Sequence, residues 1–277
     1  MQLFKQSEDT PLVFPGGKRN IRMVIRDMIP KNVFKVVSPF LGGGSVEVAT
    51  AAQGKRVIAA DIFEDLLNFW WVAKKSAPKM ARRCFDFYPI YKDEYYQLLA
   101  DYDSLTSDFE RAVYFFLINR WGYGGLTFTR PGYGFANSKQ GRQNSRERFV
   151  YGIRKLKPFR IDNLDILRAD YRETIASYPD DFLYLDPPYP YPKNVPSCDP
   201  AKFGLYGRDG DCHPPDFDQV GLARILKNRD GWIMSNRDLP SIWDIYGGWT
   251  QIFRPRYQLS LKRPKDRFHG ELLICKF

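Results

Sequence analysis

The sequence predicts an α/β fold in which an open sheet carries a long insertion. Three observations lead to this prediction. A short strand near the N-terminus is followed by a glycine-rich loop and a helix, an apolar strand in the second half ends at two prolines, and helical and aromatic segments separate the two. The chain of 277 residues is 44% hydrophobic and 16% aromatic, which is enough to bury a core in one large domain.

The apolar segment Phe182–Leu185 predicts a buried strand, and Asp186, Pro187, Pro188 and Tyr189 follow it directly. Neither proline can donate a hydrogen bond to a neighbouring strand, so the strand must end near Asp186. In an open α/β sheet, ligands bind in the crevice beyond the carboxyl ends of the strands. The segment therefore predicts a ligand site that contains a carboxylate, a rigid turn and an aromatic ring.

These groups suit methylation of an exocyclic amino group on a nucleic-acid base. Such an amine is a poor nucleophile because its lone pair is delocalised into the ring. The Asp186 carboxylate and the Pro187 carbonyl can each accept one of its N–H bonds, which localises the lone pair and offsets the developing positive charge. Tyr189 can stack on a base that has left its helix. The alternative is a strand that ends in a Pro-Pro turn with a surface tyrosine.

A strand predicted at 34–40 leads into the glycine-rich loop 41–45, and a helix follows. This order is typical of nucleotide sites in α/β proteins, where glycines let the backbone approach a ligand closely. The loop is not a phosphate-binding P-loop, because no Gly-Lys-Ser/Thr follows it. The next predicted strand ends at Asp61, close to the spacing at which an acidic residue meets the ribose hydroxyls of a nucleoside. Asp61 would serve equally well as a helix N-cap.

A glycine pair also lies near the N-terminus, where residues 14–18 read Phe-Pro-Gly-Gly-Lys. Gly16 and Gly17 permit a tight turn before the amphipathic segment 21–29, which predicts a helix. Backbone amides of this turn, together with Lys18, can hold a carboxylate. A turn without a ligand is the alternative for this motif taken alone.

The alternation of strand and helix stops after Phe63. Helical periodicity follows at 66–75, 91–102 and 109–119, and glycines among aromatic and β-branched residues at 119–135 predict a β-hairpin. A long insertion between the strands of a sheet is seldom a passive loop. We therefore predict that this region is a target-recognition subdomain.

The net charge of +10 favours a polyanionic partner. Most of the excess lies between Arg120 and Arg160, where ten basic residues stand against the single acidic residue Glu147. A charge run is usually a solvated face, but one this unbalanced and interleaved with aromatic rings favours a phosphate-contacting surface. A second group of basic residues lies in the C-terminal part and consists of Lys262, Arg263, Lys265 and Arg267.

The last third of the chain returns to alternating strands and helices. The pattern predicts strand character at 156–168, a helix at 173–177, a strand at 231–238 and a closing antiparallel hairpin from 251–261 and 271–277. The segment 190–215 is rich in Pro, Gly, Asp and Tyr and has no periodicity, which fits a lid over a site and plain flexibility equally well.

Cysteine and histidine usage argues against a metal site. The four cysteines are scattered, and the two histidines, His213 and His269, lie far apart. We expect reduced thiols in a cytosol-like compartment and no metal. No apolar run is long enough to span a membrane, and no charged-then-apolar leader follows Met1.

Four motifs, in their order along the chain, resemble those of Dam-like, alpha-ordered enzymes of the D12 class, which methylate adenine N6 in DNA with S-adenosylmethionine. They are Phe-Pro-Gly-Gly-Lys at 14–18, Pro-Phe-Leu-Gly-Gly-Gly-Ser at 39–45, Asn-Arg-Trp-Gly-Tyr-Gly-Gly-Leu at 119–126 and Asp-Pro-Pro-Tyr at 186–189. The resemblance implies a Rossmann-like methyltransferase fold with an inserted recognition subdomain of helices and a β-hairpin. It also implies that the target base is flipped, since the amine is unreachable within the stack.

Site residues follow from the resemblance by position. The implied catalytic residues are Asp186, Pro187, Pro188 and Tyr189. Those implied to bind the methyl donor are Phe14, Gly16, Gly17, Lys18, Pro39, Phe40, Gly42, Gly43, Gly44, Ser45, Asp61, Ile62, Asp170, Tyr171 and Asp186. Those implied to contact DNA are Arg120, Tyr123, Gly124, Leu126, Arg130, Lys139, Arg142 and Arg146. Asp170 is an equally good helix N-cap, and Ser235-Asn236 matches a motif that lines the target-base pocket.

One departure bears on the target sequence. Enzymes of this group that read GATC carry a hairpin arginine against a guanine, and Phe128 occupies the matching position here. Arg130 or Arg142 could take that part, since arginine pairs bidentately with guanine O6 and N7. Three alternatives to a DNA adenine enzyme stay open at this point: a cytosine-N4 DNA methyltransferase, an RNA adenine methyltransferase, and an inactive protein that binds nucleic acid.

The resemblance also implies an organisation and a setting. Residues 1–75 and 158–277 are expected to form the catalytic domain, and 76–157 the recognition insert. The expected substrate is DNA, double-stranded, with a cognate restriction nuclease as a candidate partner and no membrane. The expected location is the cytoplasm of a bacterium, or of a phage-infected cell, in association with the nucleoid.

Overall fold

A computed structural model describes residues 6–128, 131–136, 138–190, 217–254 and 271–277. Within these residues a seven-stranded sheet has the order β3-β2-β1-β4-β5-β7-β6. The strands are β1 (Lys35–Ser38), β2 (Arg56–Asp61), β3 (Leu164–Arg168), β4 (Phe182–Leu185), β5 (Trp232–Arg237), β6 (Gln251–Phe253) and β7 (Glu271–Lys276). The first five are parallel, and β7 pairs antiparallel with both β5 and β6. This confirms the predicted α/β class.

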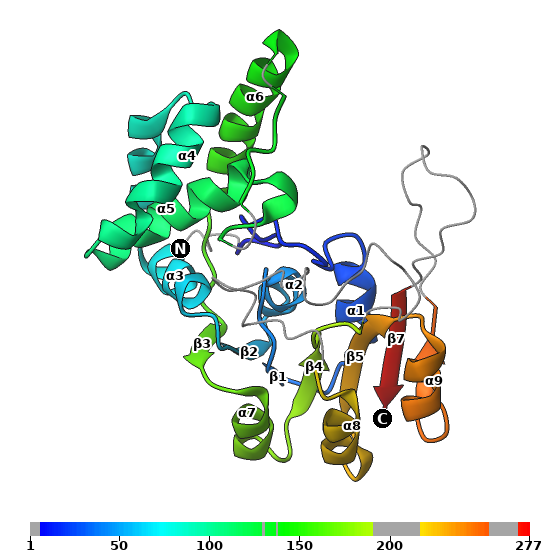
Figure 1. Ribbon diagram of the computed structural model, residues 1–277. Coiled ribbons are helices and arrows are strands. Elements are labelled where there is room, and N and C mark those ends of the chain that lie inside the picture. The colour runs from blue at the N-terminus through cyan, green and yellow to red at the C-terminus, as the bar shows by residue number, and fades with distance from the viewer. Residues whose placement is uncertain (1–5, 129–130, 137, 191–216, 255–270) are drawn as a thin grey trace.

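Helices cover both faces of the sheet (Figure 1). On one face, α1 (Arg22–Met28) and α2 (Ser45–Ala52) pack their apolar side chains on β1, β4, β5 and β7. On the other face lie α7 (Tyr171–Ser177), α8 (Gln219–Lys227) and α9 (Pro240–Tyr246). β4 is buried at all four of its residues, which agrees with its largely apolar sequence and with its place as a central parallel strand.

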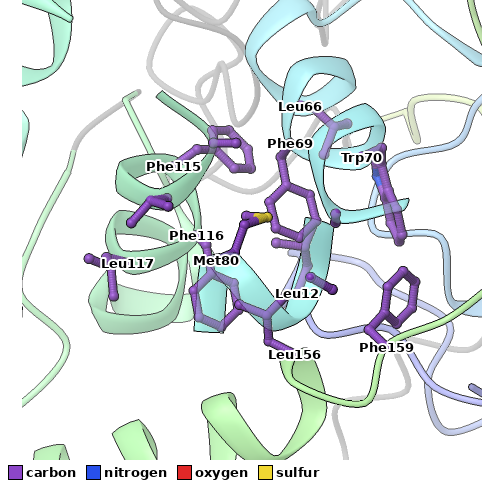
Figure 2. Close-up of a cluster of buried hydrophobic side chains, with 14 of the residues drawn as sticks. Leu12, Leu66, Phe69, Trp70, Met80, Phe115, Phe116, Leu117, Leu156 and Phe159 are labelled. Atoms are coloured by element: carbon purple, nitrogen blue, oxygen red, sulfur yellow. The ribbon is translucent and has the colours of Figure 1, made fainter. Parts of the chain in front are cut away.

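The segment between β2 and β3, which contains the predicted insert 76–157, is built from helices that rise above the sheet (Figure 1). They are α3 (Glu64–Arg83), α4 (Lys92–Asp101), α5 (Asp108–Trp121) and α6 (Lys139–Leu156), with three short 3₁₀ turns, η1 (Cys84–Phe87), η2 (Tyr102–Ser104) and η3 (Tyr123–Gly125). Figure 2 shows how α3 and α5 bring Phe69, Phe115 and Phe116 together with Met80 between them. This core continues into the sheet through Val57 and Ala59 of β2, so the insert is anchored to the sheet rather than separate from it.

The prediction of a regular β-hairpin at 119–135 was wrong. In the described part of that segment, α5 runs on to Trp121, η3 follows, and one isolated antiparallel bridge joins Gly122 to Tyr133. The apolar face of α5 is buried up to its last turn, which holds these residues in helix. Helices α6, α8 and α9 were not predicted; α6 is mostly polar, and the first half of its buried stripe consists of Gly141 and Ser145, so that only Phe149, Ile153 and Leu156 give it an apolar pattern.

Candidate active site

A cavity of about 470 Å³ opens at the carboxyl ends of β1, β2 and β4. Its lining includes every residue for which the sequence predicted a catalytic or donor-binding role: Phe14, Gly16, Gly17, Lys18, Pro39, Phe40, Gly42, Gly43, Gly44, Ser45, Asp61, Ile62, Asp170, Tyr171, Asp186, Pro187, Pro188 and Tyr189. Three motifs far apart in sequence therefore meet in one place. The cavity has the size of a typical small-molecule site.

Asp186 lies where β4 ends, and Lys18 reaches it from the N-terminal turn. The Lys18 Nζ is 2.8 Å from Asp186 Oδ1 and 3.6 Å from Glu271 Oε1, and it donates to the Gly16 carbonyl at 2.6 Å. Burial raises the pKa of Asp186, and the charge of Lys18 opposes that rise. Burial alone would lower the pKa of Lys18, but the negative charges of Asp186 and Glu271 have the larger combined effect, so the pKa of the lysine is raised. The pair is therefore a charged one inside the cavity wall.

Tyr189 is fixed by the same group of charges. Its hydroxyl donates to Glu271 Oε1, and the Lys18 Nζ lies 4.6 Å from the centre of its ring. The peptide after the prolines is fixed too, because Gln219 Nε2 donates to the Pro188 carbonyl at 2.8 Å. Asn236 Nδ2 in turn donates to Gln219 Oε1 at 3.1 Å. The Asp-Pro-Pro-Tyr corner is thus held by hydrogen bonds from three separate segments.

The glycine-rich loop is crowded on both sides. Gly44 has a φ of +65°, and a Cβ there would lie 2.6 Å from the Trp70 ring. At Gly43 a Cβ would lie 2.5 Å from that of Phe14. A side chain at either position would therefore strain the turn or displace an aromatic ring that shapes the cavity.

Asp61 ties this loop to the end of β2. Its carboxylate accepts hydrogen bonds from the backbone N–H groups of Gly42 at 2.9 Å, Ile62 at 2.9 Å and Phe63 at 3.0 Å. Burial raises its pKa, against these three hydrogen bonds. Asp61 lines the cavity, where its predicted role toward a ligand remains a prediction. The alternative was wrong, because the N-cap of α3 is Phe63 and Asp61 accepts from backbone groups that precede the helix.

Asp170 and Tyr171 line the cavity just after β3, the strand that pairs with β2. Asp170 is the N-cap of α7 and accepts from the Arg172 N–H at 2.8 Å, which is the structural alternative foreseen for it. The Tyr171 ring stacks on Phe40, with centroids 5.3 Å apart. Its hydroxyl oxygen is buried without a hydrogen-bond partner in the described part of the chain. A ligand with a polar group at that point would satisfy it.

The sequence did not single out Glu47, which lines the cavity, or Glu271, which contacts the lining residues Lys18 and Tyr189. Glu47 lies in the first turn of α2, is 3% exposed, and accepts a hydrogen bond from Ser38 Oγ at 2.6 Å. Burial raises its pKa to about 8. An acid in an otherwise apolar helix start was the available signal for Glu47; no signal pointed to Glu271, which meets Lys18 only through the fold.

The residues predicted to contact DNA divide into three groups. Lys139, Arg142 and Arg146 lie exposed on α6, and Tyr123 is 71% exposed beside η3, near Gly124 and the half-buried Leu126. Arg120 is 1% exposed, with its Nε and Nη2 lacking partners among the described residues, so it offers no surface contact in this conformation. Arg130 lies outside the described residues, as do Lys262, Arg263, Lys265 and Arg267.

Phe128 has a structural place. Its ring centre is 4.6 Å from that of Tyr102 and 6.1 Å from that of Phe115. The side chain therefore packs on the aromatic core of the insert. An arginine at this position would lose that packing, which gives a physical reason for phenylalanine here.

Two further properties concern the described residues only. They contain no group of three or more His, Cys, Asp or Glu side chains placed to hold a metal ion. None of their helices combines the length and apolar character needed to cross a membrane.

Comparison with known proteins agrees with the architecture. The model of the D12 class N6 adenine-specific DNA methyltransferases matches residues 14–260. The DNA adenine methylase of Haemophilus influenzae is 27% identical over 96% of this chain and 92% of its own length. The DNA adenine methylase of Escherichia coli K12 and the retron Ec67 DNA adenine methylase of Escherichia coli are each 28% identical, over 89% and 88% of this chain and 83% and 82% of their own lengths. The chain belongs to the D12 class of N6 adenine-specific DNA methyltransferases.

Proposed function

We propose that the cavity binds S-adenosylmethionine and that the Asp186 corner directs its methyl group to adenine N6 in DNA. The observation that carries this proposal is the convergence of the N-terminal turn, the glycine-rich loop and the Asp-Pro-Pro-Tyr corner on one cavity. The family supplies the reaction, adenine-N6 methylation, and implies a methyl donor. The cavity fits this donor in three respects: its volume, the glycine-rich loop in its wall, and the Tyr171 hydroxyl, which lacks a hydrogen-bond partner among the described residues.

When bound, S-adenosylmethionine supplies a methyl group on a positively charged sulfur. The residues of the cavity position and polarise the acceptor. Asp186 accepts one N–H of the adenine amine and the Pro187 carbonyl accepts the other, which concentrates the lone pair on nitrogen. Lys18 favours the ionised form of Asp186, since its charge counters part of the effect of burial on the carboxyl. Catalysis then consists of positioning and of stabilising the positive charge that develops on the amine.

The Tyr189 ring is proposed to stack on an adenine that has left the duplex. Its position supports this, because the hydrogen bond to Glu271 fixes the ring beside Asp186 and within the cavity. An amine inside the base stack cannot reach a carboxylate buried at the end of a strand. Base flipping is therefore the step that brings the two together.

The helical insert is proposed to hold the DNA, with residues 76–157 as the recognition part and 1–75 and 158–277 as the catalytic part. The backbone of α3 is non-helical at Ser76, which places a bend at the proposed boundary. The exposed basic residues of α6 support contact with phosphates of double-stranded DNA. Arg120 would have to leave its buried position to join them.

Transfer of label from S-adenosylmethionine with a tritiated methyl group tests this function. Double-stranded DNA, single-stranded DNA and RNA of the same sequence are offered as separate substrates, and the labelled nucleosides are then separated. The expected product is N6-methyladenine, with duplex DNA the best substrate. Labelled N4-methylcytosine, label found chiefly in RNA, or DNA binding without any label would each overturn the proposal.

The target sequence and its setting are a further part of the proposal. Because Phe128 is a core residue, the insert must read its site without an arginine at that position. Mapping of modified bases in a methylated genome by single-molecule sequencing gives the target. A restriction nuclease that cuts the same sequence only when it is unmethylated would identify a cognate partner.

A further inference from the structure

Glu47 is a buried carboxyl group in the cavity that the proposed mechanism does not use. It occupies the first turn of α2, just after the glycine-rich loop, and lines the cavity together with Lys18, Tyr184 and Asp186. Only 3% of it is exposed. Its one described side-chain partner is neutral, the hydroxyl of Ser38 on β1. A carboxylate in such a place is costly unless a positive charge lies nearby.

The wall around Glu47 has more acids than bases. From the N-terminal turn, Lys18 attracts the charge of Glu47, and from the end of β4, Asp186 repels it. Lys18 is already engaged by Asp186 and, across the cavity wall, by Glu271 of β7. The two tyrosines nearest this group, Tyr184 and Tyr189, are neutral, because burial raises the pKa of each well above its usual value. Lys18 therefore lies near three carboxyl groups but forms ion pairs with only two of them, Asp186 and Glu271. Glu47 has no ion pair among the described residues.

This imbalance makes Glu47 sensitive to the charge of a ligand. Burial raises its pKa to about 8, so at neutral pH and without ligand it is mostly protonated. A cation that enters the cavity favours the ionised form, and a neutral ligand does not. S-adenosylmethionine and the product S-adenosylhomocysteine share their amino and carboxyl groups and differ in the methyl group and the charge on sulfur. They should therefore differ in their effect on Glu47.

We propose that Glu47 changes protonation with the charge of the bound cofactor, ionised when the donor with its positive sulfur is bound and protonated when the product with its neutral sulfur is bound. The inference rests on the proposed function, since it takes S-adenosylmethionine as the donor. Glu47 is a positioning residue in this account, because it acts through charge and is not required to touch the reacting atoms.

The proton balance of the cycle closes. Glu47 releases one proton to solvent when the donor binds. In the transfer step the amine lone pair forms the N–C bond, the electrons of the S–C bond return to sulfur, and the amine must lose one proton. Glu47, ionised and buried in the same cavity, takes up one proton as the positive charge disappears. The product then leaves a site that has its original protonation state, and one proton has been released for each methyl group transferred.

Calorimetry without DNA tests the inference, because no transfer takes place. The heat of binding is measured at pH 7 in buffers of different ionisation enthalpy, which gives the number of protons released. For the wild-type protein, S-adenosylmethionine should release about one proton more than S-adenosylhomocysteine. For Glu47→Gln that difference should fall to near zero. The same difference in Glu47→Gln as in the wild type would overturn the inference.

Affinity measured against pH gives a second readout. Wild-type affinity for S-adenosylmethionine should rise up to about tenfold per pH unit between about pH 6 and 8, and affinity for S-adenosylhomocysteine should stay flat. Glu47→Gln should bind the product as the wild type does and lose the extra rise for the donor. Equal pH profiles for the two ligands in the wild type would contradict the inference.

Two further variants keep the test sharp. Ser38→Ala removes the hydrogen bond that favours the ionised form of Glu47, so the proton release should move to higher pH. Glu173→Gln, on the exposed surface of α7, makes the same chemical change outside the cavity and should behave as the wild type. Label transfer to DNA is measured in parallel. If the wild type methylates DNA but releases equal numbers of protons on binding S-adenosylmethionine and S-adenosylhomocysteine, only the role of Glu47 is refuted. If the wild type does not bind S-adenosylmethionine at all, the proposed function is refuted.

Discussion

The cavity and helix α6 carry opposite charges. Asp61, Asp186, Glu47 and Glu271 gather at the carboxyl edge of the sheet, where the buried Lys18 pairs with Asp186 and Glu271. Helix α6 presents basic side chains to solvent, with Glu147 as its acidic exception. The first arrangement suits a small cation that must be enclosed, and the second suits an extended polyanion that must be released. One chain thus keeps the buried acidic groups of the cavity apart from the exposed basic groups of α6.

The two regions also differ in how a sequence reveals them. Strands β1, β2 and β4 and the loops after them were predictable, because apolar runs that end at glycine, aspartate or proline have few alternatives. The meeting of Lys18 with Asp186 and Glu271 was not, since it depends on which strands become neighbours. In the insert, composition showed a basic surface but not its structure. The glycines and aromatic residues at 119–135 suggested a hairpin, whereas the buried face of α5 holds part of that segment in helix.

Arg120 shows the limit of reading charge from sequence. It belongs to the basic run and was predicted to contact DNA, yet the fold buries it between α5 and α6, with its guanidinium carbon 5.5 Å from the centre of the Tyr151 ring. Burial lowers its pKa to about 10. A list of basic residues cannot separate such a side chain from the exposed Arg142 and Arg146.

Asp186→Ala is expected to have the largest effect, because it removes the carboxylate proposed to accept from the target amine. We predict a fall in single-turnover methyl transfer of about 10³-fold or more, with most of the donor affinity retained. The measurement is transfer of label with enzyme in excess over DNA. Asp180→Ala, at the exposed turn that precedes the same strand, is the control and should keep full activity. An active Asp186→Ala enzyme would refute the role assigned to this residue.

The cost of charge burial in the cavity is tested by stability against pH. Without ligand, the pKa of Glu47 is about 8 in the folded state and 4.5 in its ordinary state, so the folded protein binds more protons between these values. The resulting stability is fully present below about pH 4.5 and is lost as pH rises through 8. Glu47→Gln should therefore gain on the order of 2–4 kcal/mol over the wild type between pH 5 and 8, measured by urea unfolding. A constant difference between the two proteins over this range would show that Glu47 is ionised throughout.

The role of α6 is tested by its salt dependence. The double variant Arg142→Ala/Arg146→Ala should bind duplex DNA about tenfold more weakly, and the slope of log affinity against log salt should fall by about 2. The matched control is Arg224→Ala/Lys227→Ala, which removes two exposed charges from α8 at the opposite end of the molecule (Figure 1). An equal loss in both double variants would point to net charge alone rather than to a surface on α6.

The smallest expected effect concerns Arg120. Arg120 is a buried charge whose Nε and Nη2 lack hydrogen-bond partners among the described residues. Replacing it by an apolar side chain of similar size removes a desolvation cost, so Arg120→Met should raise the free energy of unfolding by about 1 kcal/mol. If Arg120 also swings out to a phosphate, the same variant should bind DNA more weakly. A variant that is less stable and binds DNA normally would show that the guanidinium is a structural group and not a contact held in reserve.

The central claim is that the carboxylate at the end of β4 accepts the amine of an extruded adenine. A structure of the protein with duplex DNA and a non-transferable analogue of S-adenosylmethionine tests it most directly. The account predicts the target adenine outside the stack, with N6 within hydrogen-bond distance of Asp186 and of the Pro187 carbonyl and with the Tyr189 ring against its face. An adenine that enters the cavity with N6 away from Asp186, or a cofactor bound elsewhere, would contradict it.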